Sequence, residues 1–542
     1  MIQVGGSNLI TIRNHWLPER DGRTDAVLST VTGAISILGL VALAICPVFL
    51  QPSEDATILF RYADNLARTG SISFNLNGPH TEGATDFLWM LLLSTARLAG
   101  MAPYTITGAI SAVAVVATVL LLFRIAGAEF RIGAASLLVL ALLLCPQTLA
   151  AATGFSVFVF GATIVVTTYF YLRQEETALA ISAVILCLLR PDGAVFAIPL
   201  LGFAFLQSAN KRHTAAICGL VFALPLLLYF VWRWSYFGEF LPLPFLVKSD
   251  AARWHGVLIE GSASAILVYC ALAAPIIWFA CGRRVVESAN LRLLTALIIV
   301  PSAFYAEIRL DQNVADRFLY YIIIGVAVLV AFNARNPEFS RKKVMLATVA
   351  CLAVLFPWKW APGALSLARQ DVSNVGQILL AIRGEDLSGR MAVTEAGWLP
   401  YYTGWQATDL WGLNTAEFAH HLVQPAQIPG LGADLIVVHS PQTQFDCSLN
   451  HDWQVPYQVR NWSNMVANVI VGASLANYEL YMVPEENEAG HRIHLIYHNY
   501  AKGEGEYYCY FVSAQYAERD KLIEILRQHG ALTASEFEAL RK

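Results

Sequence analysis

The chain has 542 residues, of which 56% are hydrophobic and only 14% are charged. Soluble globular proteins carry about 25% charged residues, so this composition excludes an ordinary soluble protein and is typical of a chain that lies largely in a lipid bilayer. The formal net charge of -4 excludes the strongly basic surface that nucleic-acid binding requires, and we expect no nucleic-acid partner.

Apolar stretches of membrane-spanning length recur through the first two thirds of the chain. Residues 1–26 are largely polar, so we predict a cytoplasmic N-terminal segment followed by a retained membrane anchor rather than a cleaved signal peptide. We predict about eleven spans within a membrane domain over 27–357, at 27–50, 104–124, 132–146, 153–172, 176–189, 193–208, 214–233, 262–281, 292–306, 317–333 and 343–357. The predicted fold class is therefore mainly α, a polytopic helix bundle.

Basic residues between these stretches predict which side of the membrane each connection faces. They fall in alternate connections, at Arg13, Arg20, Arg23, Arg124, Arg131, Arg173, Lys211, Arg212, Arg283, Arg284, Arg341, Lys342 and Lys343. The positive-inside rule makes that side cytoplasmic. The alternation requires that 86–100 does not cross, so we predict that this segment lies in the interface, with Trp89 and Arg97 as anchors.

Residues 358–542 have ordinary polarity and follow the last span on the outer side. Four β-like runs separated by turn residues predict a soluble α/β domain, at 433–440, 478–484, 492–498 and 507–513. Helices are predicted over 519–528 and after a capping box that begins at Thr533. Cys447 and Cys509 could form a disulfide if this domain is extracytoplasmic, whereas the other seven cysteines lie in apolar stretches.

Charged residues on the predicted outer side lie near the membrane boundary, where charge is costly to place. They include Glu54, Asp55, Arg61, Glu82, Asp86, Arg190, Asp192, Lys248, Asp316 and Arg317. Any one of them alone is commonly a snorkelling or loop residue, but their convergence on one side indicates a polar site at the outer leaflet. There a carboxylate can act as general base on a sugar hydroxyl, and arginine or lysine can hold a phosphate. These residue types alone do not separate a transferase from a carrier of lipid phosphates.

The first outer loop, 51–100, also resembles a known family. The stretches EDATILFRYADNLARTGSISFN and HTEGATDFLW are similar to the first-loop signature of type C fold (GT-C) membrane glycosyltransferases related to the terminal β-arabinofuranosyltransferases of mycobacterial cell walls. The matching positions are Glu54, Asp55, Ala56, Arg61, Tyr62, Ala63, Asn65, Leu66, Phe74, Asn75, Glu82, Gly83, Leu88 and Trp89. Later matches follow in order: LLRPDGAVF, YFGEFLPLPFLVK, ADRFLYY and VTEAGWLPYYTGWQATDLWGLNTAEFAH. One departure is Ser156, which stands where the family has an acidic residue.

The resemblance implies a polyprenyl-phosphate sugar donor, a glycan acceptor and an active site that faces out of the cytoplasm. Asp55 is the predicted catalytic base, with the N-cap of the following helix as its alternative role. Glu54 would share the acceptor or raise the pKa of its neighbour. The predicted donor-phosphate residues are Arg61, Arg190, Lys248 and Arg317, and their alternative partners are Glu54, Asp192, Asp250 and Asp316.

The acceptor side is predicted from the same matches. It comprises Glu82, Glu395, Tyr402, Asp409, Trp411 and Asn414. Glu82 could instead pair with Arg61, and the others could simply shape a turn. The sequence requires no cofactor; outer carboxylates could hold a divalent cation, although no ligand spacing demands one.

We therefore expect an inverting glycosyltransferase of the bacterial inner membrane, with a periplasmic α/β domain, that moves a sugar such as arabinofuranose onto a cell-envelope glycan. The alternative is a non-catalytic transporter or flippase of lipid-linked sugars. It is disfavoured because the charges converge on one side only and no inverted repeat is visible.

Overall fold

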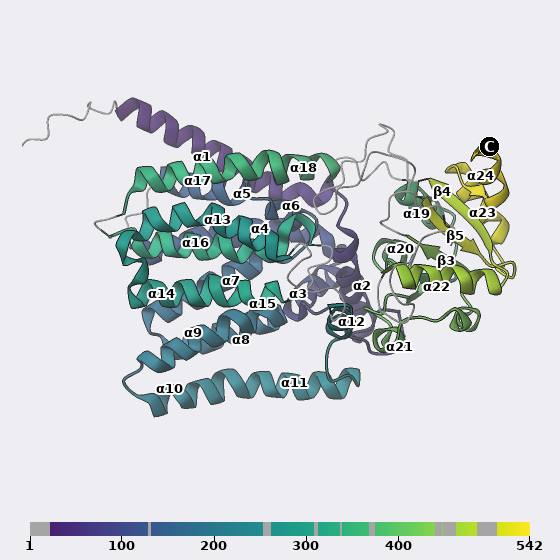
Figure 1. Cartoon of the computed structure of the whole chain (residues 1–542), viewed down its shortest axis with the longest axis horizontal. Helices are drawn as coiled ribbons and strands as arrows, with labels where there is room; N and C mark the ends of the chain where they lie inside the picture. The colour runs from purple at the N-terminus through teal and green to yellow at the C-terminus, as the bar shows by residue number, and fades with distance from the viewer. Residues whose placement is uncertain are drawn as a thin grey trace, which may run out of the picture.

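A computed structural model describes residues 22–127, 132–252, 262–307, 313–336, 339–367, 374–439, 447, 462–484 and 507–541. The protein consists of a helix bundle and a smaller α/β domain, which lies at one end of the bundle (Figure 1). The described chain enters the α/β domain after α18 and does not return to the bundle.

The bundle is a multi-pass membrane domain. Among the described residues, seven apolar helical segments are long enough to cross a bilayer: Thr30–Val48, Pro103–Ala126, Lys211–Phe237, Ser262–Val286, Ser288–Ala306, Val314–Asn333 and Arg341–Ala364. They contain α4 (Thr107–Ala126), α10 (Lys211–Ile217), α11 (Leu224–Phe237), α13 (Ser262–Cys281), α14 (Ser288–Leu294), α15 (Val300–Ala306), α16 (Tyr320–Asn333), α17 (Arg341–Leu355), and parts of α1 (Gly22–Ile45) and α18 (Ala361–Leu367).

The other four predicted spans are shorter helices. They are α5 (Ile132–Leu143), α7 (Val157–Arg173), α8 (Glu176–Leu189) and α9 (Ala194–Gln207), with 12, 17, 14 and 14 residues. At about 1.5 Å per residue they are roughly 18–26 Å long, which is less than the roughly 30 Å hydrocarbon core. The polytopic helix bundle is therefore confirmed, whereas the number of about eleven spans stays a prediction.

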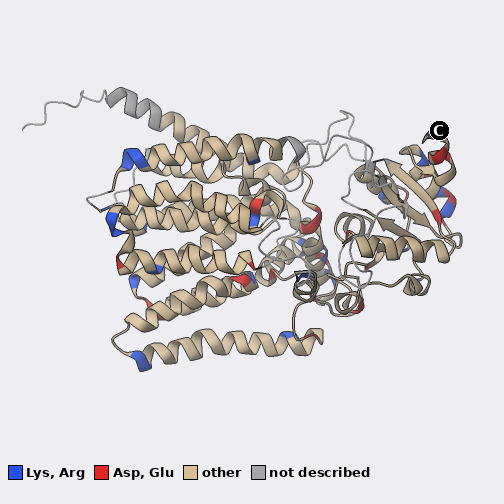
Figure 2. Ribbon diagram, viewed as in Figure 1, with Lys and Arg blue, Asp and Glu red and all other residues tan. Residues whose placement is uncertain are grey.

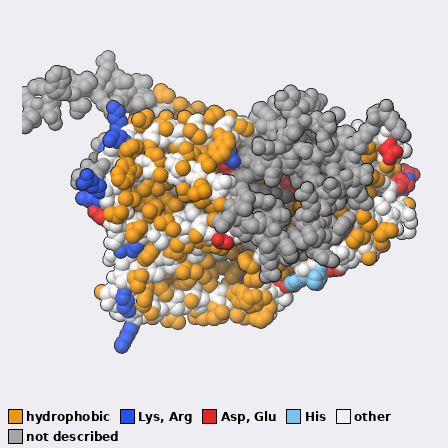
Figure 3. Space-filling model, in the orientation of Figure 1, with side chains coloured by type: hydrophobic (Ala, Val, Ile, Leu, Met, Phe, Trp, Pro, Cys, Tyr) orange, Lys and Arg blue, Asp and Glu red, His pale blue; other side chains and the backbone are white. Residues whose placement is uncertain are grey.

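Basic side chains gather at the end of the bundle that lies away from the α/β domain (Figure 2). Arg124 and Arg173 lie in the last turns of α4 and α7, and Lys211 and Arg341 begin α10 and α17. Hydrophobic side chains cover the flank of the bundle (Figure 3), which is the surface that lipid chains contact in a membrane. Arg13, Arg20 and Arg131 lie outside the described residues.

Three helices lie between the bundle and the α/β domain: α2 (Glu54–Thr69), α3 (Phe87–Leu98) and α12 (Leu243–Ala252) (Figure 1). α2 begins after Ser53 with two acidic residues in its first turn, where the helix dipole favours negative charge. It ends at Gly70, whose φ of 72° is the left-handed conformation that glycine adopts without strain. α3 packs against α2 and, at twelve residues or about 18 Å, is too short to span the hydrocarbon core alone.

Among its described residues, the α/β domain is built on a six-stranded sheet with the order β2-β1-β3-β5-β4-β6. Its strands are β1 (Arg390–Val393), β2 (Gln406–Asp409), β3 (Leu435–Val438), β4 (Glu479–Pro484), β5 (Tyr507–Val512) and β6 (Leu532–Thr533). β1 pairs parallel with β2 and β3, and the remaining pairs are antiparallel. Its other helices are α19 (Asn374–Gly384), α20 (Trp398–Thr403), α21 (Ala416–His420), α22 (Trp462–Leu475), α23 (Arg519–Gln528) and α24 (Ala534–Arg541).

Both faces of this sheet are covered, as the central strand β3 shows. Leu435 and Val437 pack on the side of α19 and α23, and Ile436 and Val438 pack on the side of α22. All four side chains are buried, which explains why this strand is apolar throughout rather than alternating.

The predicted runs 433–440, 478–484 and 507–513 contain β3, β4 and β5, and the predicted helix 519–528 is α23. The capping box before α24 is confirmed, with the Thr533 N–H donating to Glu536 Oε2 at 2.7 Å. The run 492–498 lies outside the described residues. β1 and β2 were not predicted, because each contains a single β-branched residue, whereas the equally short β3 is a continuous apolar run.

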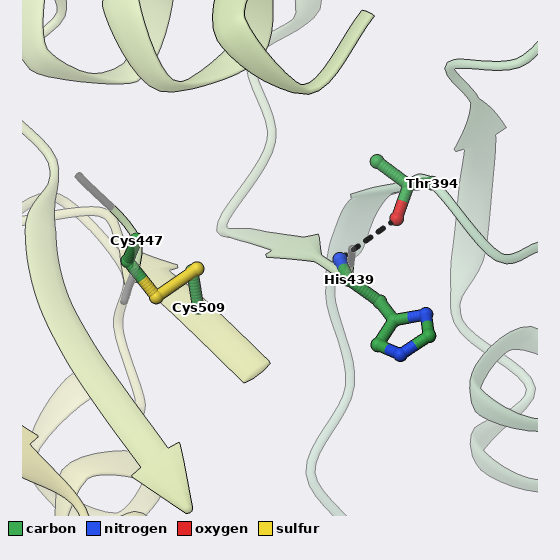
Figure 4. The surroundings of a disulfide bond; sticks show 4 residues. All are labelled: Thr394, His439, Cys447 and Cys509. Atoms are coloured by element: carbon green, nitrogen blue, oxygen red, sulfur yellow. Dashed lines mark hydrogen bonds between the residues drawn. A yellow bond between two sulfur atoms is a disulfide. The ribbon is translucent and has the colours of Figure 1, made fainter. Parts of the chain in front are cut away.

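Two further features are the helix that leads into the α/β domain and a disulfide within the domain. The last membrane helix continues past the predicted boundary at 357, through a π-helical turn at Phe356–Trp360, and ends at Leu367. Cys447 and Cys509 form a disulfide, with their Cα atoms 5.8 Å apart (Figure 4).

Candidate functional site

The first turn of α2 places two carboxylates at the end of the bundle that faces the α/β domain. Ser53 is the N-cap residue of α2, so Asp55 is the second residue of the helix, and its alternative role as N-cap is wrong. Asp55 Oδ2 lies 3.1 Å from Nη2 of Arg317. Arg317 is only 8% exposed, so water screens this ion pair much less than a surface pair.

Arg190 lies in the same region. Its guanidinium donates to both carboxylate oxygens of Asp192, at 3.1 and 2.6 Å, so the alternative partner predicted for Arg190 is confirmed. The guanidinium carbon of Arg190 also lies 5.0 Å from the ring centre of Phe318, and that of Arg317 lies 4.8 Å from the same ring. The two guanidinium groups therefore share one aromatic neighbour, whose face favours cations.

Asp86 completes this group. It lies at the start of α3, and its Oδ2 accepts a hydrogen bond from Ser156 Oγ at 2.7 Å. Burial raises the pKa of Asp86 above its usual value, although Arg190, the Ser156 hydroxyl and Arg317 act in the opposite direction. Ser156 lies where the resemblance predicts an acidic residue, and Asp86 places a carboxylate beside it. We call Asp55, Asp86, Arg190, Asp192 and Arg317 the outer charged cluster, where outer means the side of the bundle on which the α/β domain lies.

Glu54 points from α2 toward the α/β domain. Its Oε1 accepts a hydrogen bond from the Gly397 N–H, and a Cβ atom at position 397 would overlap the Glu54 carbonyl oxygen. Glu54, Glu395, His439 and Tyr508 contribute to the lining of a cavity of about 20 Å³. That volume accommodates one water molecule and no sugar, so this cavity is not the predicted acceptor site.

The two carboxyl groups of this cavity differ in their affinity for a proton. Burial, and then the charges of Glu395 and Asp55, raise the pKa of Glu54 well above its usual range. Burial acts in the same direction on Glu395, but His439 Nδ1, 3.0 Å from Glu395 Oε1, and the Tyr508 hydroxyl outweigh it and lower its pKa. Of the two carboxyl groups, Glu54 therefore holds a proton more tightly.

Arg61 is occupied elsewhere. Its guanidinium donates to the carbonyl oxygens of Phe74 at 2.5 Å, Trp405 at 2.7 Å and Pro400, and to Asn75 Oδ1 at 2.8 Å. Two of these acceptors belong to the α/β domain, so Arg61 joins α2 to that domain. The predicted alternative pairing of Arg61 with Glu54 is therefore wrong, and we do not include Arg61 among the phosphate-binding candidates.

Glu82 is paired with a residue that was not predicted. Arg233, near the end of α11, donates from Nε to Glu82 Oε2 at 2.6 Å, and both side chains are buried. The alternative pairing of Glu82 with Arg61 is therefore wrong. Burial raises the pKa of Glu82 above its usual value, although Arg233 acts in the opposite direction.

Asp409 shapes the loop that follows β2. Its Oδ1 accepts hydrogen bonds from the N–H groups of Trp411 and Gly412, and its Oδ2 accepts from the backbone and side chain of Asn414. Burial raises the pKa of Asp409 to about 6. A Cβ atom at Gly83 would overlap Asn414 Oδ1, so the structure brings the segment that carries Glu82 against this loop.

The remaining predicted residues lie around the same interface. The Tyr402 hydroxyl donates to Gln51 Oε1 at 3.1 Å, and the half-buried Trp411 packs against Trp462 with ring centres 5.3 Å apart. Lys248 is half-buried on α12, which packs against α21. The side chain of Asp250, its alternative partner, lies outside the described residues.

Three functional candidates were missed from the sequence: Arg233, His439 and Lys359. Arg233 is the last residue of the predicted span 214–233. A charge near the membrane can mark a functional site, but this one was interpreted only as the end of the span. His439 lies near the end of the β-like run 433–440 and Lys359 follows the last predicted span, and neither belongs to a recognisable motif. Within the described ranges, no three His, Cys, Asp or Glu side chains are grouped as ligands for a metal ion.

Comparison with known proteins adds little to this geometry. Residues 367–483 match a family described as a domain of unknown function (DUF8728). The match begins where α18 ends and leaves out the membrane bundle. No curated protein matches the chain.

Proposed function

We propose that this protein is a membrane glycosyltransferase that moves a sugar from a polyprenyl-phosphate donor to a cell-envelope glycan. The observation that carries the proposal is the outer charged cluster. Arg190 and Arg317 lie against one Phe318 ring, and the carboxylate of Asp55 lies 3.1 Å from Arg317 at the end of a membrane bundle. Two guanidinium groups suit a phosphate, a carboxylate suits a hydroxyl proton, and a lipid-linked donor reaches this position from within the bilayer.

The donor phosphate would bind to the two arginines. The forked donors of a guanidinium match the oxygens of a phosphate, and Asp192 would hold Arg190 in orientation. The phosphate would compete with Asp55 for Arg317 and so free the Asp55 carboxylate to accept a proton. Lys248 on α12 remains a further candidate for the phosphate.

Asp55 would take the proton of the acceptor hydroxyl as that oxygen attacks the anomeric carbon of the sugar. The bond between the anomeric carbon and the phosphate oxygen breaks, and its electron pair leaves with the polyprenyl phosphate. Arg190 and Arg317 would stabilise the negative charge that develops on this leaving group. A single displacement of this kind inverts the configuration at the anomeric carbon.

The acceptor would approach along the loop between β2 and α21. Asp409 and Asn414 hold the shape of this loop, Trp411 offers an aromatic face for a sugar, and the segment around Glu82 packs beside it. Tyr402 and Glu395 would flank the approach from α20 and the end of β1.

We place this site on the outer face of a bacterial inner membrane, with the α/β domain in the periplasm. The disulfide between Cys447 and Cys509 supports this, since disulfides persist in oxidising compartments. The basic end of the bundle, which lies away from the site, supports the same orientation. The resemblance in the first outer loop favours arabinofuranose as the sugar.

The proposal is tested by transfer from a panel of radiolabelled polyprenyl-phosphate sugars to a cell-envelope glycan, with purified wild-type protein and Asp55→Asn. We expect transfer by the wild type and a loss of about 10²–10⁴-fold in the variant, the usual contribution of a general base. Asp64→Asn is the matched control, because Asp64 lies on the same helix and pairs with Arg68 and Arg97 at 3.7 Å. Equal activity in the two variants would exclude Asp55 as the base, and donor binding without transfer would favour a carrier.

A further inference from the structure

The turn that precedes α16 has an unusual backbone conformation. Ala315 and Asp316 both have positive φ, 51° and 55°, in the left-handed region. Neither is a glycine, so each adopts a conformation that an L-amino acid side chain disfavours. Such a turn persists only where surrounding contacts hold it. Arg317 of the outer charged cluster is the next residue in the chain.

Three segments from different parts of the bundle hold Asp316. Its side chain is fully buried, and its Oδ2 accepts a hydrogen bond from the Tyr269 hydroxyl of α13 at 2.9 Å. Nζ of Lys359 lies 3.4 Å from the same oxygen. Gln147 of α6 (Gln147–Ala152) donates to the Asp316 carbonyl oxygen at 3.2 Å.

Lys359 is the charged partner in this group. It is 4% exposed and belongs to the π-helical turn Phe356–Trp360 in the last membrane helix. π-Helical turns are rare and often occur at functional sites. A buried lysine needs a counter-charge, and Asp316 supplies one.

Asp316 and Arg317 are adjacent in the chain but contact different partners, and this indicates a role for Lys359. Asp316 points into the bundle toward Lys359, whereas the next residue, Arg317, reaches Asp55 at 3.1 Å. We propose that Lys359 is a positioning residue: by pairing with Asp316, it holds the strained turn that directs Arg317 toward Asp55 and the donor phosphate. The proposal rests on the proposed function in taking Arg317 as a ligand of that phosphate.

Lys359→Met would leave the Asp316 carboxylate buried without its counter-charge. Burial of an unpaired charge is far less favourable than burial of an ion pair or of two neutral side chains. The turn at 315–316 would then relax, and Arg317 would move with it. Asp316→Asn in the same chain removes the unpaired charge, while the amide oxygen still accepts the Tyr269 hydroxyl. The double variant therefore separates a role through Asp316 from direct contact between Lys359 and the ligand.

The first arm of the test measures sugar transfer. We expect Lys359→Met to raise the KM for the donor by about tenfold or more, and Lys359→Met/Asp316→Asn to return to within about threefold of the wild type. Lys343→Met is the matched control, because Lys343 is an exposed lysine at the other end of the same membrane helix. The proposal is overturned if Lys359→Met behaves like this control, or if the double variant is no better than Lys359→Met.

The second arm does not depend on activity. Because Asp55 and Arg317 are in contact, Asp55→Asn and Arg317→Met should change the Tm non-additively in the wild-type background. With Lys359→Met added, the two changes should become additive, since Arg317 no longer reaches Asp55. Unchanged non-additivity would overturn the proposal. If the wild type transfers sugar from no donor, the proposed function fails, and this arm alone decides the role of Lys359.

Discussion

Arg61→Met is expected to loosen the contact between the α/β domain and α2. Burial of the guanidinium lowers the pKa of Arg61 to about 10, which corresponds to about 3 kcal/mol of cost for keeping it charged. The substitution removes that cost together with four hydrogen bonds, to Phe74, Asn75, Pro400 and Trp405, although Asn65, Ala407 and Gly404 still donate to the first three acceptors. A hydrogen bond that involves a charged group contributes about 1.5–3 kcal/mol, so the loss of four such bonds is about 6–12 kcal/mol and exceeds the gain.

The net destabilisation is therefore about 3–9 kcal/mol, and it should appear as a lower Tm and faster proteolytic release of the α/β domain from purified protein. Arg68→Met is the matched control on the same helix, because Arg68 is largely exposed and lies 3.7 Å from Asp64. Such a surface pair contributes at most about 1 kcal/mol. Equal Tm and proteolysis in the two variants, with sugar transfer lost only in Arg61→Met, would refute this reasoning and restore Arg61 as a phosphate ligand.

Three further changes test the contact between the two domains. Burial raises the pKa of Glu54 above the usual glutamate value of about 4.3, so ionisation of this group costs stability. The Tm of the wild type should therefore fall as the pH rises above that value, and the Tm of Glu54→Gln should fall less; equal slopes would contradict the raised pKa. Gly397→Ala should lower the Tm by the equivalent of about 1–3 kcal/mol, because the new methyl group overlaps Glu54, whereas Gly384→Ala, with open space at its Cβ, should not; equal Tm values would contradict this. Cys447→Ser/Cys509→Ser should destabilise the α/β domain by about 4 kcal/mol, given a sequence separation of 62, and dithiothreitol should then have no further effect on the Tm.

Local sequence features predicted the elements that carry a strong local signal. The apolar stretches gave the helices of the bundle, and the β-branched and aromatic runs gave β3, β4 and β5. The direction in which each side chain of α2 points could also be predicted from the sequence. Successive residues of a helix are about 100° apart, so Glu54 and Asp55 face different neighbours, and Arg61, six residues after Asp55, points away from it. This periodicity separates Arg61 from Asp55 and so from the phosphate site.

Contacts between distant segments could not be predicted in this way. Asp55 and Arg317 are 262 residues apart, and only the packing of the bundle brings them together. The left-handed turn at 315–316 carries no glycine to signal it. Lys359 follows the last predicted span in a π-helical turn, which continues the membrane helix past the point where the apolar run ends. These features depend on tertiary packing rather than on local pattern.

The most direct test of the central claim is a single turnover with a donor that is labelled in both the sugar and the polyprenyl chain, in the presence of a cell-envelope glycan. The account predicts that labelled glycan and labelled polyprenyl phosphate appear in equal amounts, with inverted configuration at the anomeric carbon, and that Asp55→Asn produces neither. Recovery of the intact donor in the other leaflet, or release of free sugar without a new glycosidic bond, would contradict it.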